Sequence, residues 1–412
     1  MRTTTQAPSP RRRKLPPPLA KLAERHPGLA ATAGVFFSAL FAFMAIGAAL
    51  PVLPSFVRGP LHSSDLAVGI VVGAFAITSV VCRPIAGRQA DKRGRKLVLV
   101  AGALAMAVGG GLYLLSDSVP TLVLARLAVG AGEGSFYTAG ATWAVDLAPE
   151  DKRGLALGLF GLAVWGGLSL GPVAGELLRS NVGYDAVWIL TCSFPFMAAL
   201  IALRLPEPPL TAAALELERM PIFPRSSRRP GIALALANIG YAALAGFVVL
   251  DLQSRGIGNG AIVFTAFALA VFASRLGLSH VPDTWGARPT ATLAGLLEAA
   301  GLGVVALAAS LTVALLGAVI VGVGFSMLFP SLALMVVGEV GDERRGAAMG
   351  AFTAFFDIGV GLGGPICGAT ASLAGYPAVF VLSAVAALGT AALAAAPREQ
   401  PAPAMAATAP PG

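Results

Sequence analysis

Long apolar runs alternate with short polar segments along most of the 412-residue chain. A run of about 18 or more apolar residues is long enough for a helix that crosses the hydrocarbon core of a bilayer. Twelve such runs can be read, at residues 29–53, 66–86, 97–115, 120–146, 154–178, 186–205, 231–250, 260–278, 290–308, 311–338, 346–372 and 378–396. The pattern therefore predicts an all-α polytopic membrane protein with twelve transmembrane helices.

The composition supports a membrane environment. The apolar residue types A, V, I, L, M, F, W, Y and C make up 56% of the chain, a further 50 residues are glycine, and charged residues supply only 12%. Soluble domains contain roughly 45–50% apolar residues with glycine counted, and about 25% charged residues. Because a folded core cannot hide this excess of apolar surface from water, lipid must cover it.

The basic residues predict the orientation. Of the 29 lysine and arginine residues, only Arg58, Arg179 and Arg255 fall in predicted outer loops, and Arg126 falls within a helix away from its cytoplasmic end. Lys and Arg gather in cytoplasmic loops, so we expect a multi-pass protein of the plasma (or inner) membrane with both termini in the cytoplasm. The same rule accounts for the net charge of +8 without nucleic acid as a partner.

An internal repeat relates two parts of the chain at an offset of 192 residues. The segment NVGYDAVWIL at 181–190 returns as LAGYPAVFVL at 373–382, and PEDKRGLALG at 149–158 returns as GDERRGAAMG at 341–350. Each part contains six of the predicted helices. Two parallel six-helix repeats describe one transporter architecture, in which the substrate site lies at the membrane midplane between the halves.

The predicted domain organisation follows from this repeat. Residues 1–28 are a basic cytoplasmic tail, 29–205 the first six-helix bundle, 206–230 a cytoplasmic linker, 231–396 the second bundle, and 397–412 an Ala/Pro-rich cytoplasmic tail. The linker is the longest polar stretch and is rich in Pro and Arg, as expected for a segment that crosses between two bundles.

The loop between the second and third helices combines charges with glycines in the sequence GRQADKRGRK at 87–96. Three pairs of positions in and before this loop recur in the second half: Asp91 and Asp283, Gly94 and Gly286, and Arg83 and Arg275. Positive-inside anchoring explains the basic residues but neither the acid nor the glycines. Glycine permits the positive φ of a tight turn, and an acid is stabilised beside the free N–H groups of a helix N-terminus.

This loop resembles the signature of the major facilitator superfamily, G-x-x-x-D-[RK]-x-G-R-[RK]. Every defining position is filled, by Gly87, Asp91, Lys92, Gly94, Arg95 and Lys96. The resemblance implies that Asp91 and its basic neighbours bridge to the other half near the start of the eleventh helix, which Arg344 and Arg345 precede, and latch the cytoplasmic side shut. Because the second copy keeps fewer of these residues, we expect an asymmetric gate with the stronger latch on the first half.

Two ionisable residues, Arg126 and Glu133, lie within the predicted fourth helix. Their spacing of seven residues places them on nearly the same helix face, about 10 Å apart, which is too far for a direct ion pair. They therefore share a cavity or partner other helices. Ionisable residues at membrane depth are costly, and the default hypothesis for them is functional.

The sequence R-x-x-x-G-x-G from Arg126 resembles a motif of the same family whose arginine is implicated in proton transfer. Glu133 is less typical of the motif. A carboxyl group in a low-dielectric site is a plausible proton carrier because its neutral form is cheaper to bury. A structural pairing is the alternative for both residues.

The predicted fifth helix contains Gly167, Gly171 and Gly175 at steps of four, with Pro172 after the second glycine. Small residues at this spacing clear one helix face for close packing. The pattern G-x-x-x-G-P-x-x-G also resembles the antiporter motif of the superfamily, which is associated with exporters. The eleventh helix echoes it at 359–368, where G-x-G-x-x-G is rejected as a dinucleotide site because no strand precedes it.

Polar residues of the second half complete the candidate set. Asp357 in the eleventh helix is expected to line the cavity and, with Arg126 and Glu133, to couple protons. Asp251 is expected at a solvated helix end, and Glu298 is expected in the cavity, against a neighbouring helix or near an interface. The candidate substrate contacts are Asn238, Tyr241, Glu298 and Tyr137, and a packed or interfacial aromatic role is the alternative for Tyr137 and Trp143.

These features predict a secondary transporter that exports a small, amphipathic drug or metabolite in exchange for protons by alternating access. Import of a nutrient or metabolite, proton-coupled or facilitated, is the alternative on the same fold. Scattered His and Cys residues and the lack of a P-loop or nucleophile motif argue against an enzyme, a cofactor or a bound metal. The expected partners are the substrate, protons and the lipid bilayer, and the protein is expected to act as a monomer.

Overall fold

Helices make up almost all of the described chain. The computed structural model describes residues 27–148, 152–207, 224–340 and 345–397. In the first half the helices are α2 (Pro27–Ala49), α3 (Val52–Arg58), α4 (Asp65–Arg93), α5 (Arg95–Leu112), η1 (Tyr113–Leu115), α6 (Val119–Asp146), α7 (Arg153–Asn181) and α8 (Tyr184–Arg204). In the second half they are α9 (Arg225–Ser254), α10 (Ala261–Gly277), α11 (Val281–Trp285), α12 (Ala287–Ala306), α13 (Leu311–Val337), α14 (Arg345–Ala374) and α15 (Tyr376–Ala395).

Each of the twelve predicted segments corresponds to one long helix, so the predicted fold class is confirmed. The short helix α3 continues α2, the 3-10 turn η1 continues α5, and α11 is a connection before α12. Ten of the described helical segments are long and apolar enough to cross a bilayer. The remaining two are α10, which has 17 residues, and α6, whose 28 residues include Arg126 and Glu133.

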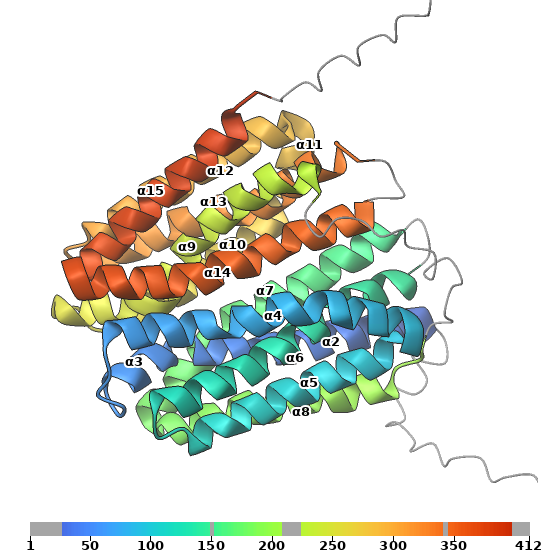
Figure 1. Ribbon diagram of the computed structural model, residues 1–412, viewed down its shortest axis with the longest axis horizontal. Helices are drawn as coiled ribbons and strands as arrows, with labels where there is room; N and C mark the ends of the chain where they lie inside the picture. The colour runs from blue at the N-terminus through green and yellow to red at the C-terminus, as the bar shows by residue number, and fades with distance from the viewer. Residues whose placement is uncertain (1–26, 149–151, 208–223, 341–344, 398–412) are drawn as a thin grey trace, which may run out of the picture.

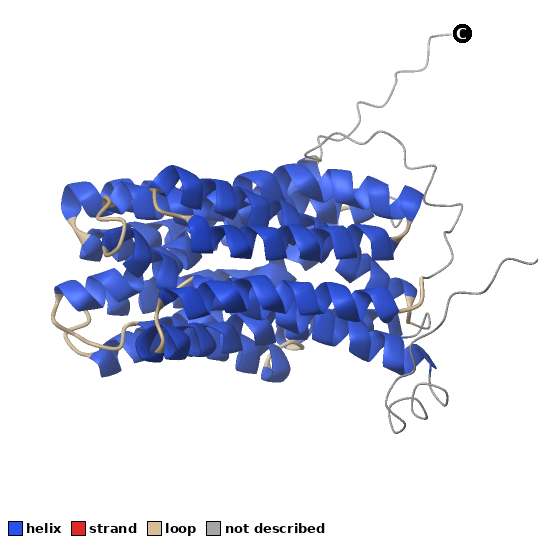
Figure 2. Cartoon of the chain, turned by 90° about the horizontal axis from the view of Figure 1, so that it is seen from below, coloured by secondary structure: helices blue, strands red, loops and turns tan. Residues whose placement is uncertain are grey.

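Two groups of six long helices lie side by side (Figure 1), and their axes run roughly parallel (Figure 2). In the first group α2 packs on α7 and α8, α4 on α6, and α5 on α6 and α8. The second group repeats this arrangement with α9 on α14 and α15, α10 on α13, and α12 on α13 and α15. The main contacts between the groups are α4 with α14 and α7 with α10.

The backbone follows the sequence repeat at its turns. Four glycines with positive φ precede helices and form two pairs at the 192-residue offset: Gly94 (φ 100°) with Gly286 (94°), and Gly183 (121°) with Gly375 (81°). Residues with a Cβ rarely adopt this region, whereas glycine enters it at little cost. The equivalent turns of the two halves therefore use the same backbone solution.

The boundary between the halves is closed at the end of the bundle where α4 begins, which we call the Asp65 end. A Cβ added to Gly69 of α4 would lie 2.2 Å from the carbonyl oxygen of Gly364 of α14, and one added to Gly73 would lie 2.7 Å from that of Gly361. Only glycines allow two backbones to approach this closely. At the same end the Tyr376 hydroxyl of α15 donates a hydrogen bond of 2.8 Å to Asp65.

The segment between the two bundles is shorter than the linker predicted from the sequence. Helix α9 begins at Arg225, inside the segment 206–230 that was expected to connect the bundles. Its polar residues precede the apolar part of the same helix, so composition alone does not mark the helix start. Residues 208–223, most of the N-terminal tail and most of the C-terminal tail lie outside the described residues.

Candidate functional site

A cavity of about 100 Å³ lies between the two halves. Most of its lining is apolar, with four charged residues among the lining side chains. The lining residues are Phe43, Ile46, Phe75, Arg83, Glu133, Tyr137, Gly161, Val164, Trp165, Leu168, Leu234, Tyr241, Arg275, Phe325, Leu328, Phe329, Thr353, Phe356 and Asp357. An apolar pocket with a few converging polar groups is the usual form of a small-molecule site, and the interface between two repeats is a common place for one.

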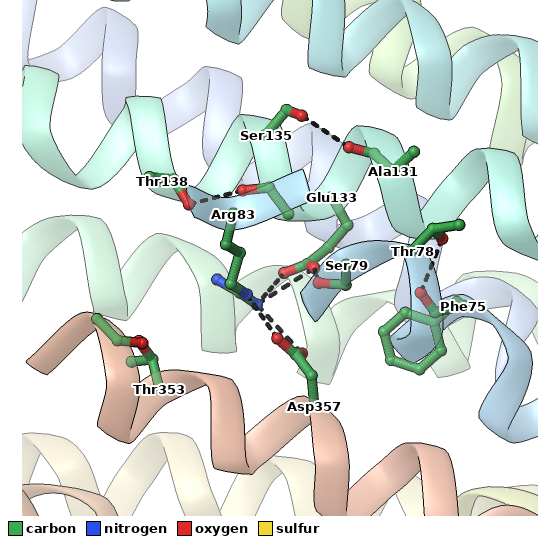
Figure 3. A network of polar contacts seen from close by, with 12 residues as sticks. Phe75, Thr78, Ser79, Arg83, Ala131, Glu133, Ser135, Thr138, Thr353 and Asp357 are labelled. Atoms are coloured by element: carbon green, nitrogen blue, oxygen red, sulfur yellow. Dashed lines mark hydrogen bonds and ion pairs between the residues drawn. The ribbon is translucent and has the colours of Figure 1, made fainter. Parts of the chain in front are cut away.

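Arg83 of α4 binds two carboxylates in this cavity (Figure 3). Its Nε donates to Asp357 Oδ2 at 2.5 Å and its Nη2 donates to Asp357 Oδ1 at 3.2 Å. The same Nη2 lies 3.1 Å from Glu133 Oε1 and 3.3 Å from Glu133 Oε2. Because Glu133 belongs to α6 and Asp357 to α14, one guanidinium joins acids from both halves.

Glycines bring Glu133 to this group. A Cβ on Gly134 would lie 2.7 Å from the carbonyl oxygen of Ser79, so α6 reaches α4 closely only because Gly134 has no side chain. The Ser79 hydroxyl then donates to Glu133 Oε2 at 2.7 Å. The ring of Tyr137, one turn further along α6, lies 4.9 Å from the Arg83 guanidinium carbon, a distance at which a cation–π contact forms.

The charges of this group do not cancel. Two carboxylates around one guanidinium leave one net negative charge when all three residues are ionised. The side chains of Arg83, Glu133 and Asp357 are only 13%, 6% and 1% exposed. Burial of an uncompensated charge is costly, so a proton on one of the two carboxyl groups lowers the cost of burying the group.

Arg126 lies apart from Glu133, although both are on α6. Its Nε donates to the Val71 carbonyl at 3.0 Å and its Nη2 to the Val72 carbonyl at 3.2 Å. Its Nη1 lies 3.4 Å from the Tyr113 hydroxyl. The structure thus brings Glu133 and Asp357 together, as a shared cavity requires, and pairs Arg126 with backbone carbonyls of α4 instead.

Two candidate substrate contacts, Tyr137 and Tyr241, line the cavity, but Asn238 and Glu298 do not. Both of these residues are fully buried in the packing of the second half. The Asn238 amide nitrogen donates to the Leu234 carbonyl at 2.8 Å. The Glu298 carboxylate faces Gly240 of α9, and neither of its oxygens has a hydrogen-bond partner among the described residues. Helix rotation, which apolar spans do not reveal, turns both residues away from the cavity.

Asp251 is not at a solvated helix end, which corrects the sequence expectation. It is completely buried near the end of α9 and pairs with Arg255 at 2.9 Å. Arg255 donates further hydrogen bonds to the carbonyls of Ala306 and Ala308, at 2.9 and 2.7 Å. The pair therefore joins the end of α9 to the end of α12 and is structural.

Within the described residues, the signature loop makes its ion pairs inside the first half. Arg95 binds Asp91 and, at 3.0 Å, Asp146 at the end of α6. The expected partner Arg344 lies outside the described residues, as does the side chain of Arg345. The latch across the halves stays a prediction.

Of the signature residues, Gly87 and Asp91 differ in role from the sequence expectation, whereas Gly94 agrees with it. Gly87 lies inside α4, which continues to Arg93, so it does not form the turn. Gly94 does form it, with φ 100°. The carboxylate at the α5 N-terminus is Glu207 rather than Asp91, and it accepts the Lys96 N–H at 3.1 and 3.2 Å.

Two basic residues of the loop are placed at the helix ends. Lys92 lies in the last turn of α4. The Lys96 ammonium lies 3.4 Å from the Leu203 carbonyl near the end of α8, where a cation is favoured by the free carbonyl groups.

The antiporter-like glycines of α7 pack against α2. Cβ atoms added to Gly167, Gly171 and Gly175 would lie 2.6, 2.5 and 2.2 Å from carbonyl oxygens of α2. Pro172 lies inside the helix and is buried. The motif thus holds two helices of the first half together and does not reach the cavity lining.

Sequence reasoning missed Arg83, Arg275 and Trp165 as site residues. The available signal was the repeat itself, because Arg83 and Arg275 are a matched pair of cations inside apolar spans, near the ends of those spans. No three His, Cys, Asp or Glu side chains within the described ranges lie together as a metal site.

The comparisons with known proteins agree with this architecture. A family model described as Major Facilitator Superfamily matches residues 35–262 and 230–411. The chain belongs to the major facilitator superfamily. A relative from Salmonella typhimurium, called an uncharacterized MFS-type transporter, is 35% identical over 356 residues, which cover 84% of this chain and 91% of the relative. One from Burkholderia pseudomallei (strain K96243), with the same description, is 30% identical over 361 residues, 85% of this chain and 88% of the relative.

Solved structures of this superfamily share the fold at low sequence identity. The human organic anion transporter MFSD10 (TETRAN) is similar with a TM-score of 0.69 and 20% identity, over 89% of this chain and 99% of that structure. The nucleoside transporter NupG, solved as a point mutant, has a TM-score of 0.72 and 15% identity, over 88% of this chain and 98% of that structure. As a member of the superfamily, the chain is a multi-pass membrane transporter.

Proposed function

We propose that this protein is a proton-coupled secondary transporter that moves a small amphipathic molecule through the cavity between its halves. The observation that carries the proposal is the binding of Arg83 to Glu133 of the same half and Asp357 of the other half, at the cavity wall. A proton on Asp357 neutralises one of the two charges of the Arg83–Asp357 ion pair, which joins the halves at the cavity wall. The proton therefore changes how readily the halves rock, which is the requirement for coupling.

The direction of transport has two candidates. Export by proton antiport is favoured by the resemblance of Gly167, Gly171, Pro172 and Gly175 to the antiporter motif. Import together with protons is favoured by the charges of the cavity, where Arg275 adds a cation to the group around Arg83. A proton bound to that group makes the cavity net positive and so aids the binding of a negatively charged substrate.

A flux assay in liposomes that contain the purified protein tests both parts of the proposal. A panel of radiolabelled drugs and metabolites is offered under an imposed pH gradient of either sign. Proton coupling predicts accumulation that collapses when an uncoupler is added. Accumulation on the acidic side identifies antiport and accumulation on the alkaline side identifies symport, whereas fluxes that ignore the gradient contradict the proposal.

The role of the ionised group is tested by matched variants. Glu133→Gln and Asp357→Asn are expected to lose gradient-driven accumulation, because each removes a titratable carboxyl from the cavity. Glu176→Gln is the control, since Glu176 pairs with Arg179 outside the cavity. Gradient-driven accumulation at the wild-type level in both Glu133→Gln and Asp357→Asn would show that these carboxyl groups do not couple protons to transport.

A further inference from the structure

Arg275 of α10 is a second arginine of the cavity wall, and no carboxylate within the described residues holds it. Its Nε is buried without a hydrogen-bond partner. Within the described part of the chain, no hydrogen bond or ion pair reaches its guanidinium. Its guanidinium carbon lies 5.0 Å from the centroid of the Trp165 indole ring, a distance at which a cation–π contact forms. The two carboxylates that line the same cavity are both engaged by Arg83.

The internal repeat shows what has changed around this arginine. At the 192-residue offset the three members of the Arg83 group have three equivalents that also line the cavity: Arg275 for Arg83, Phe325 for Glu133, and Trp165 for Asp357. The rings of Trp165 and Phe325 are in edge contact, with centroids 5.7 Å apart. The equivalent group thus keeps the cation, as Arg275, but has aromatic rings in place of both acids, with Phe325 in the second half and Trp165 in the first.

We propose that Arg275 binds the acidic group of an organic anion, whose apolar part lies against Trp165 and Phe325. A guanidinium is suited to a carboxylate or phosphate because its N–H groups form a fork that matches two oxygens. The ring of Trp165 stabilises the cation before an anion binds but offers no oxygen that would compete with one. The aromatic rings supply the flat apolar surface that an amphipathic anion requires.

This inference rests on the proposed function in one respect, that the cavity is the transport site. It concerns the charge of the substrate and holds for either direction of transport. A neutral or cationic substrate would leave the Arg275 guanidinium buried without an anion in the bound state, which is the costly arrangement.

The test is equilibrium binding to the purified full-length protein in detergent, without a proton gradient. The probes are phenylacetate, indole-3-acetate and 2-naphthylacetate, each compared with the corresponding amide and with the amine of the same ring. We expect at least one acetate to bind about tenfold or more tightly than its amide and amine. Arg275→Gln should abolish this preference, and Arg275→Lys should retain part of it because the charge is kept.

Arg179→Gln is the matched control, since Arg179 pairs with Glu176 away from the cavity. It should leave the preference unchanged. Equal binding of acetates and amides by the wild-type protein would overturn the inference, as would a preference that persists in Arg275→Gln. Gradient-driven flux without anion preference would contradict this inference alone, and anion preference without gradient-driven flux would contradict the proposed function alone.

Discussion

Arg83 and Asp357 lie on opposite halves of the protein and are joined by two contacts, 2.5 Å from Nε to Oδ2 and 3.2 Å from Nη2 to Oδ1. Asp357 is 1% exposed, so water does not screen this pair. Along α4, Asp65 comes first, the Gly69–Gly364 contact next, and the Arg83–Asp357 pair last. The charges of Arg83 and Asp357 therefore affect how easily the halves separate at the end of the bundle opposite the Asp65 end.

Removal of Arg83 should harm the protein more than removal of either acid. Arg83→Gln leaves two buried carboxylates without a cation, and breaking a buried ion pair in this way costs about 3–5 kcal/mol. Asp357→Asn still leaves Glu133 bound to Arg83 and should cost less. Thermal unfolding in detergent measures the difference, and an Asp357→Asn protein less stable than Arg83→Gln would contradict this ranking.

The contact between α4 and α14 should not tolerate a methyl group. In Gly69→Ala the new Cβ would lie 2.2 Å from the Gly364 carbonyl oxygen, so the helices must separate. Overpacking of this kind costs roughly 1–3 kcal/mol. We expect a lower unfolding temperature and slower transport. Gly303→Ala is the control because a Cβ there meets no atom within 4 Å, and an equal loss in both variants would speak against the interhelical contact as the cause.

A substitution at Gly94 should destabilise the protein in two ways that can be measured separately, by backbone strain and by displacement of Glu207. Gly94→Ala places a Cβ at φ 100° and 2.6 Å from Glu207 Oε1, so it strains the backbone by about 1–3 kcal/mol and also displaces the acid that accepts the Lys96 N–H. Gly183→Ala has φ 121° with nothing within 4 Å and incurs only the backbone strain. Unfolding temperatures should fall further for Gly94→Ala, and the reverse order would rule out a role for the Glu207 contact.

Acidification should strengthen the binding of an anion to the cavity. The ionisable groups that line it are Arg83, Glu133, Tyr137, Tyr241, Arg275 and Asp357. A proton taken up by either carboxyl adds one positive charge to the cavity. For a separation of about 10 Å between that carboxyl and the bound anion, and an effective dielectric constant of about 20, the added charge stabilises the bound anion by roughly 1.5 kcal/mol, or about tenfold in affinity. Titrations of an aromatic acetate at falling pH, above the pKa of the acetate itself, measure the effect.

The sign of this effect also separates the two transport modes. By linkage, an anion that binds more tightly to the protonated cavity also promotes proton binding, as symport requires. Weaker binding at low pH would favour antiport. In Glu133→Gln the pH dependence should shrink, since one of the two carboxyl groups is gone.

The twelve helices could be predicted because each contains a run of mostly apolar residues about as long as a bilayer crossing, with few charged residues inside it. The repeat was equally accessible, because Gly94 and Gly286 or Gly183 and Gly375 occupy turns that only glycine fills well. These are local properties of the chain, so a single sequence contains them.

The cavity could be predicted only in part, because its lining depends on how each helix is rotated. Asp357 was expected to line a cavity, and Glu133 to share one with Arg126 or to partner other helices; Glu133 and Asp357 line the cavity and Arg126 does not. Glu298 is also an acid within a predicted transmembrane helix, yet it faces Gly240 within the second half. The prediction for Asp251 was wrong for a similar reason, since its partner Arg255 follows one turn later and turns back to cover it.

The glycine contact between α4 and α14 has a consequence for the speed of transport. Gly69 and Gly73 meet Gly361 and Gly364 backbone to backbone, with the Pro365 ring beside Gly73. Helices that interlock through large side chains must change rotamers before they can slide or tilt. We therefore expect repacking of this contact to add little to the barrier of each transport cycle.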